Sequence, residues 1–133
     1  MKFGVPIVVA LLMVIAGCDD GKPIVLTSSR LPSPDGQSVA IVESVDNGLG
    51  FGQGMLYDEV HVGPMDLRTV GHFDFDAYVV FYAARESITA SAPTVSWVDA
   101  NHVRIAYDAS QSPTRPFDRI GRIRVEYVAQ SSP

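Results

Sequence analysis

The fold is indicated most clearly by residues 122–127, which read Arg122-Ile123-Arg124-Val125-Glu126-Tyr127. Apolar side chains alternate strictly with charged ones in this stretch. A period of two places successive side chains on opposite faces of a β-strand. The pattern therefore predicts a strand with one face in a hydrophobic core and the other face in water.

Short apolar segments recur through the chain before this strand. They are rich in Val, Ile, Tyr and Phe, and turn-forming residues separate them about every ten positions, which is typical of an all-β domain. The expected strands are residues 24–28, 38–46, 55–62, 73–81, 94–98 and 103–107. About seven strands suit a small antiparallel β-sandwich or one strongly curved single sheet.

Two segments carry more specific expectations. Residues 94–98 and 103–107 are predicted to pair as a hairpin, with Trp97 and Ile105 as core partners. Residues 78–82 are apolar on both sides, so we expect them to form a central strand.

The amino-terminal residues have the layout of a secretory signal peptide. Lys2 supplies a positive charge, residues 5–15 form an apolar run, and small residues precede Cys18. A helix that spans a membrane needs roughly 20 apolar residues, and this run is shorter. We therefore expect a helical signal peptide that is removed after export.

The sequence Ile15-Ala16-Gly17-Cys18 resembles the lipobox of bacterial lipoproteins. The resemblance implies cleavage after Gly17, a diacylglyceryl thioether on the Cys18 sulfur, and acylation of the new amine, for example with palmitate. Two or three acyl chains, at about 0.8 kcal/mol per buried methylene, anchor a protein stably to a membrane. Asp19 resembles the retention signal of enteric lipoproteins, which favours the inner over the outer membrane. The alternative is an unmodified cysteine after an ordinary signal peptide.

These observations divide the chain into a signal peptide (1–17), a lipidated tether (18–22), a β-rich domain (23–129) and a flexible tail (130–133). Cys18 is the only cysteine, so the domain forms no internal disulfide. Removal of the signal peptide takes away one basic residue and leaves nine against fifteen acidic residues, a formal charge of −6. Such a chain has no general attraction for phosphate backbones, so nucleic-acid binding is not expected.

The turn Ser33-Pro34-Asp35-Gly36, with the strand that follows it, resembles a blade hairpin of TolB-like β-propellers, and residues 95–105 are similar to a degenerate second copy. The chain is too short to close a propeller. It is more similar to small, functionally uncharacterised bacterial lipoproteins that have the same early turn, a glycine-containing middle loop and a late hairpin with Trp. That resemblance implies a fold and a membrane address but no activity.

Five potential metal ligands occur within about twenty residues: Asp58, His61, His72, Asp74 and Asp76. Imidazole and carboxylate groups bind zinc and similar ions, so a periplasmic enzyme or metal-binding protein that uses this region is one hypothesis. Their spacing matches no metal motif, and solvated loops and strand edges are the preferred interpretation. Asp58 also interrupts an otherwise apolar strand face.

No catalytic motif surrounds the serines or histidines, so we expect neither catalytic residues nor a cofactor. The glycine-rich stretch 47–54 contains Phe51, a candidate contact for a partner. Arg104, Arg122 and Arg124 are candidates for a positive patch.

The preferred interpretation of these arginines is pairing with Glu126 and Asp108 across neighbouring strands. The sequence thus favours a non-catalytic accessory or protein-interaction lipoprotein on the periplasmic side of a bacterial membrane. Its partners would be the membrane, through the lipid on Cys18, and an envelope protein. An inhibitor or immunity-type lipoprotein is a further alternative.

The lipobox generates a direct test of the membrane address. Mass spectrometry of the native product is expected to show an amino terminus at Cys18 that carries acyl chains, and Cys18→Ser should abolish the modification. An intact leader, or an unmodified sulfur at position 18, would contradict the prediction.

Overall fold

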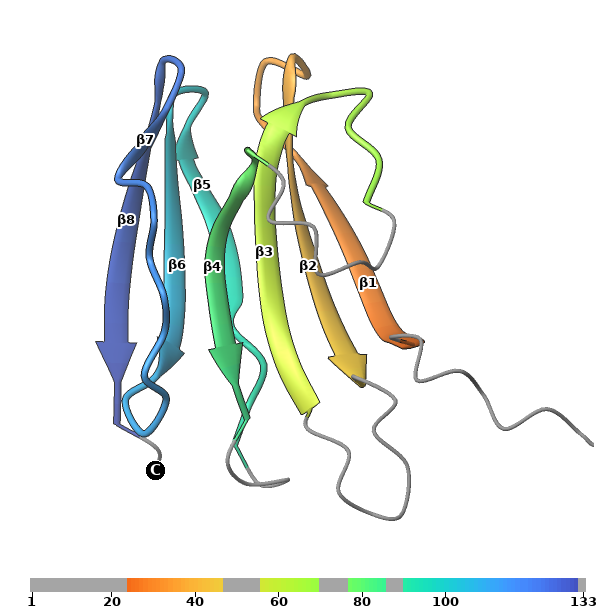
Figure 1. Ribbon diagram of the computed structural model, residues 1–133. Coiled ribbons are helices and arrows are strands. Elements are labelled where there is room, and N and C mark those ends of the chain that lie inside the picture. The colour runs from red at the N-terminus through yellow and green to blue at the C-terminus, as the bar shows by residue number, and fades with distance from the viewer. Residues whose placement is uncertain (1–23, 47–55, 70–76, 86–89, 132–133) are drawn as a thin grey trace, which may run out of the picture.

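The computed structural model describes residues 24–46, 56–69, 77–85 and 90–131. These residues contain eight β-strands (Figure 1). The strands are β1 (Ile24–Pro32), β2 (Ser38–Asp46), β3 (Leu56–Pro64), β4 (Val79–Ala84), β5 (Thr94–Asp99), β6 (His102–Asp108), β7 (Arg119–Ile120) and β8 (Ile123–Gln130). Sheet A has the strand order β1-β2-β3-β4, and sheet B has the order β5-β6-β8-β7. The all-β prediction is confirmed. Within these ranges no helix has the length and apolar character needed to cross a bilayer.

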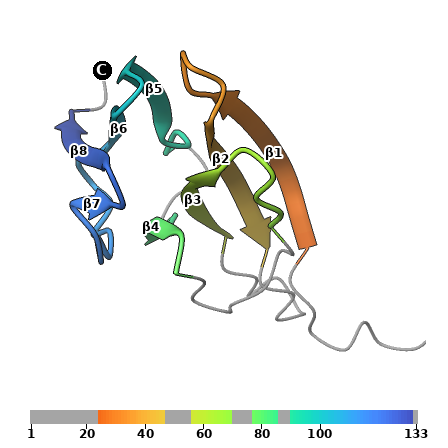
Figure 2. The same ribbon diagram turned by 90° about the horizontal axis from the view of Figure 1, so that it is seen from above.

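The two sheets stack face to face, as the view from above shows (Figure 2). Trp97 of β5 donates a hydrogen bond to the Leu31 carbonyl of β1 at 2.8 Å. At the other side of the sandwich, Tyr127 of β8 donates to the Val80 carbonyl of β4 at 2.6 Å. Of the two predicted arrangements, the chain therefore adopts the β-sandwich and not the single curved sheet.

Alternate residues of both sheets form the core between them. Phe81 and Tyr107 pack across the interface with ring centroids 5.6 Å apart. Burial of each large apolar side chain contributes about 1.5–3 kcal/mol, and the domain has no disulfide to add to this. The buried residues of this core are Ala40, Val60, Val62, Val80, Phe81, Ala83, Val95, Val103, Ile105, Tyr107, Ile123 and Val125.

Sheet A is covered on its outer face as well, over the middle strands β2 and β3. Val39 and Ile41 pack there against Leu67, with Tyr78 beside them. A Cβ atom at Gly63 would lie 2.9 Å from the Tyr78 ring, so only glycine admits this close approach. β2 and β3 are consequently buried on both faces, whereas nearly all of β1 is exposed.

Several local predictions are confirmed. The segment 38–46 is a strand with the predicted bounds, and Gly36 in the turn before it has a φ of 69°. β5 and β6 pair as the predicted antiparallel hairpin. Ile105 is fully buried and Trp97 packs against the same core. One boundary differs from the prediction, because Gln130, expected in the flexible tail, is the last residue of β8.

Two expectations about the sheets are wrong. The sandwich is not purely antiparallel, because β6 and β8 pair in parallel. A parallel pair needs a crossover of about a dozen residues or more, and residues 109–122 supply it. The apolar segment around residues 78–82 forms β4, which is last in the order of sheet A and not central. Its edge is instead covered by the crossover, since Tyr82 and Thr114 exchange two backbone hydrogen bonds of 3.2 and 2.8 Å.

The buried Tyr127, which joins the two sheets through its hydrogen bond to Val80, makes the free energy of unfolding depend on pH at high pH. Burial raises the pKa of Tyr127 to about 12, with the nearby charges of Arg115 and Asp118 acting in opposite directions. An unfolded tyrosine titrates near pH 10. Between about pH 10 and 12 the unfolded chain therefore releases a proton that the folded chain retains, and stability falls as pH rises through this window.

Urea unfolding between pH 9 and 12 should show this loss, and Tyr127→Phe should make the decline shallower. The decline need not disappear, because burial also raises the pKa values of Tyr57 and Tyr82. An identical slope in the variant and the wild type would count against the assignment.

Candidate functional site

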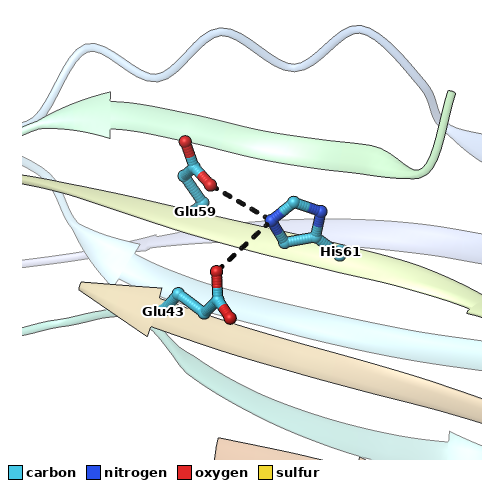
Figure 3. Close-up of side chains that lie close together, drawn as sticks. All are labelled: Glu43, Glu59 and His61. Carbon is cyan, nitrogen blue, oxygen red and sulfur yellow. Dashed lines mark hydrogen bonds and ion pairs between the residues drawn. The ribbon is translucent and has the colours of Figure 1, made fainter. Parts of the chain in front are cut away.

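Three ionisable side chains meet on the outer face of sheet A: Glu43 of β2 and Glu59 and His61 of β3 (Figure 3). Glu43 lies directly opposite Glu59 in the β2–β3 register. His61 follows Glu59 by two residues, so strand alternation places both on one face. Local β-structure alone therefore brings the three groups together.

The cluster is both close and dry. The His61 Nε2 atom lies 3.1 Å from a Glu59 carboxylate oxygen and 3.9 Å from Glu43 Oε2. The exposed fractions of Glu43, Glu59 and His61 are 3%, 5% and 4%. Charged side chains are rarely buried to this extent unless they are paired or bind an ion.

Hydroxyl groups hold one side of the Glu43 carboxylate. Ser28 of β1 donates to Glu43 Oε1 at 3.2 Å, and Thr69 donates a short hydrogen bond to the same oxygen. Thr69 belongs to the segment that follows β3 over the sheet, and Arg30 fixes that segment by donating to the carbonyls of Leu67 and Met65, each at 2.9 Å. Glu43 is therefore held in place by hydrogen bonds from Ser28 of β1 and from Thr69 of the segment after β3.

Two tyrosines lie beside the cluster. Tyr82 is the register partner of Glu59, and its ring centroid is 5.0 Å from that of Tyr57. Burial is the main cause that raises the pKa of both phenols, and the Glu59 charge adds to it. Both side chains therefore stay protonated at neutral pH and border the cluster as neutral polar groups.

The ligand set predicted from sequence is only partly brought together. His61 belongs to the cluster, but Asp58 lies on the opposite face of β3, toward sheet B, because the two differ by an odd number of residues. His72, Asp74 and Asp76 lie outside the described residues.

Asp58 instead accepts from a buried polar network in the core. Arg85 donates to both carboxylate oxygens at 2.5 and 3.2 Å. Ser44 donates at 2.7 Å, and Gln111 of the crossover at 3.3 Å. The break in the apolar face that Asp58 causes is thus a satisfied ion pair, and the β2–β3 register continues past it without a shift.

Sequence reasoning missed Glu43 and Glu59. Two signals were available for them. Glu43 is the one charged residue inside the otherwise apolar and hydroxylic run from 38 to 45, and Glu59-Val60-His61 has the spacing of two side chains on one strand face. What the sequence did not give was the pairing of β2 with β3, which sets Glu43 opposite Glu59.

A second charged region occupies one end of the sandwich. Arg104 and Arg124 lie on the outer face of sheet B, and Arg104 pairs with Glu126 at 2.7 Å as the preferred interpretation predicted. Arg122 pairs with Asp35 of the β1–β2 turn at 3.3 Å. The three arginines therefore do not form one uniform patch. Asp108, the other expected partner, accepts from Ser110.

The positive charge is concentrated where the turns of sheet B meet. An open hollow of about 440 Å³ lies there, lined by Asp99, Ala100, Asn101, His102, Arg119, Arg122 and Arg124. Among the described residues, no carboxylate lies within ion-pair distance of Arg119 or Arg124. The planar guanidinium group of arginine binds carboxylates and phosphates through paired hydrogen bonds, so this hollow suits an anionic group.

No family model, curated protein or solved structure matches this chain. Cys18 and Asp19, for which the sequence predicts lipidation and sorting, and Phe51, the candidate contact, lie outside the described residues. The two charged regions and the sequence of the leader are therefore the features of the chain that bear on its function.

The ion pair of Asp58 gives a stability test. Asp58→Ala leaves the mostly buried Arg85 guanidinium without its carboxylate, and loss of one partner of a buried pair costs about 3–5 kcal/mol. Urea unfolding should show a decrease in the free energy of unfolding near the lower of these values, since Arg85 is in part exposed. Arg104→Ala, at an exposed pair, is the control and should give a several-fold smaller change. Equal effects of the two changes would contradict this account.

Proposed function

We propose that the protein is a lipid-anchored, non-catalytic accessory protein of the bacterial cell envelope that presents the cationic end of its sandwich to an acidic surface of a partner protein. The observation that carries the proposal is the gathering of Arg119, Arg122 and Arg124 around one hollow of an otherwise acidic chain. The lipobox, with Cys18 as its lipidated residue, supports the membrane anchor.

The position of the hollow supports a partner away from the membrane. β1 begins at Ile24, six residues after the expected lipid attachment, and its far end leads into the β1–β2 turn. Arg122 contacts that turn through Asp35 and Gln37, so the hollow lies at the end of β1 remote from the tether (Figure 1). The eight steps between the nine residues of β1, at about 3.3 Å each, separate the two ends by roughly 26 Å.

The form of the hollow supports protein contact over catalysis. It is open and polar, whereas small-molecule sites are concave and mostly apolar with a few convergent polar groups. Charge complementarity between a positive patch and an acidic partner speeds association and selects the partner. Arginine is, in addition, enriched at protein interfaces and among their most important contacts.

Affinity capture from detergent-solubilised envelope, with the full lipidated chain as bait, tests the proposal. We expect Arg124→Glu to reduce recovery of the specifically bound partner at least tenfold. Arg68→Glu is the matched control, because Arg68 is exposed, lies outside the hollow and changes the net charge equally. Recovery should also fall when the salt concentration is raised from 0.15 to 0.5 M.

Two outcomes would count against this function. One is equal recovery with Arg124→Glu and Arg68→Glu. The other is failure of the wild-type chain to enrich any envelope component in repeated experiments.

A further inference from the structure

The buried cluster on sheet A, formed by Glu43, Glu59 and His61, places two carboxyl groups beside a single imidazole. Glu43 and Glu59 face each other directly across two antiparallel strands, and like charges in that position destabilise a sheet. His61 is the only basic side chain within ion-pair distance of either carboxylate among the described residues.

One oxygen of the cluster is left without a hydrogen bond. Ser28 and Thr69 both donate to Glu43 Oε1, whereas Glu43 Oε2 is buried and accepts from no donor of the described residues. This free oxygen is the one directed at His61 Nε2 (Figure 3). An unsatisfied buried carboxylate oxygen carries a substantial desolvation penalty, and native proteins seldom tolerate one without a partner.

The separations between the three groups match those of ligands around one ion. One potential ligand atom from each of Glu43, Glu59 and His61 lies within 4.8 Å of the others. Ligands at about 2.0–2.1 Å from a tetrahedral ion lie roughly 3.3 Å from one another. The distances from Nε2, 3.1 Å to Glu59 and 3.9 Å to Glu43, bracket this value. Only small side-chain shifts would therefore place the three atoms around an ion.

We infer that Glu43, Glu59 and His61 form a binding site for a divalent transition-metal ion, with Zn²⁺ as the best-suited ion. A cation between Glu43 and Glu59 relieves the direct opposition of the two carboxyl groups, and Glu43 Oε2 gains its missing partner. Imidazole with carboxylates suits zinc, whereas Ca²⁺ and Mg²⁺ are bound mainly by oxygen ligands. Three protein ligands leave at least one coordination position for water.

The hydroxyl groups around the cluster fit the same assignment. Groups that hydrogen-bond to a ligand fix its orientation and strengthen metal binding. Ser28 and Thr69 do this for Glu43 by occupying Oε1 and leaving Oε2 for the ion. Because Thr69 belongs to the segment that covers sheet A, ion binding would also hold that segment against the sheet. The site is thus independent of the cationic hollow in sheet B.

Isothermal titration of the full chain in detergent with ZnCl₂ tests the inference. We expect one Zn²⁺ per chain with a micromolar or lower Kd, and a Tm that rises by several degrees at saturating zinc. Glu43→Gln keeps the shape of the side chain but removes its charge, and it should weaken binding about 100-fold and abolish the rise in Tm. Glu126→Gln, at the exposed carboxylate beside His102, is the matched control and should bind as the wild type does.

A second measurement needs no variant of the site. In the wild-type chain with ¹⁵N-labelled histidine, the His61 ring signals should shift on addition of one equivalent of zinc, while those of His102 should not. The inference is overturned if the wild type shows no saturable binding, if Glu43→Gln binds zinc as tightly as Glu126→Gln, or if the His61 signals do not move.

Discussion

Burial of β3 on both of its faces is the constraint on which the rest of the structure depends. Every residue from Tyr57 to Gly63 is buried, so each polar side chain on this strand must find a partner inside the protein. On the face toward sheet B, Asp58 finds Arg85 and its hydrogen-bonding neighbours. On the outer face, Glu59 and His61 meet Glu43 under the segment that follows β3. The core ion pair and the proposed metal site thus both provide partners for polar side chains of a strand that is buried on both faces.

The sandwich also separates two chemical environments along its length. The expected lipid lies just before β1, and the cationic hollow lies beyond the other end of the same strand. Paired strands are stiff, so this distance cannot collapse as it would in a flexible linker. The Arg122 contacts to Asp35 and Gln37 join sheet B to the β1–β2 turn, which fixes the hollow relative to β1. The proposed membrane attachment and the proposed partner contact would therefore use different parts of the protein.

Much of the fold was predictable from local pattern, but the pairing of distant strands was not. Period-two alternation identified β8, and the Ser33–Gly36 turn and the β5–β6 hairpin followed from turn chemistry. The parallel pairing of β6 with β8 depends on where the crossover after β6 lies, which no local signal encodes. The same limit applies to the candidate site. His61 was identified as a possible ligand, but its carboxylate neighbours depend on the β2–β3 register, so Asp58 was grouped with it in error.

The position of Trp97 has a practical consequence. It is the only tryptophan of the chain, and its indole bridges the two sheets by donating to the Leu31 carbonyl while its ring packs on the shared core. Its fluorescence emission therefore arises from a single place, the junction between the layers. Circular dichroism reports strand content, whereas this emission reports whether the layers are in contact. The two signals together distinguish a sandwich that has come apart from strands that have melted.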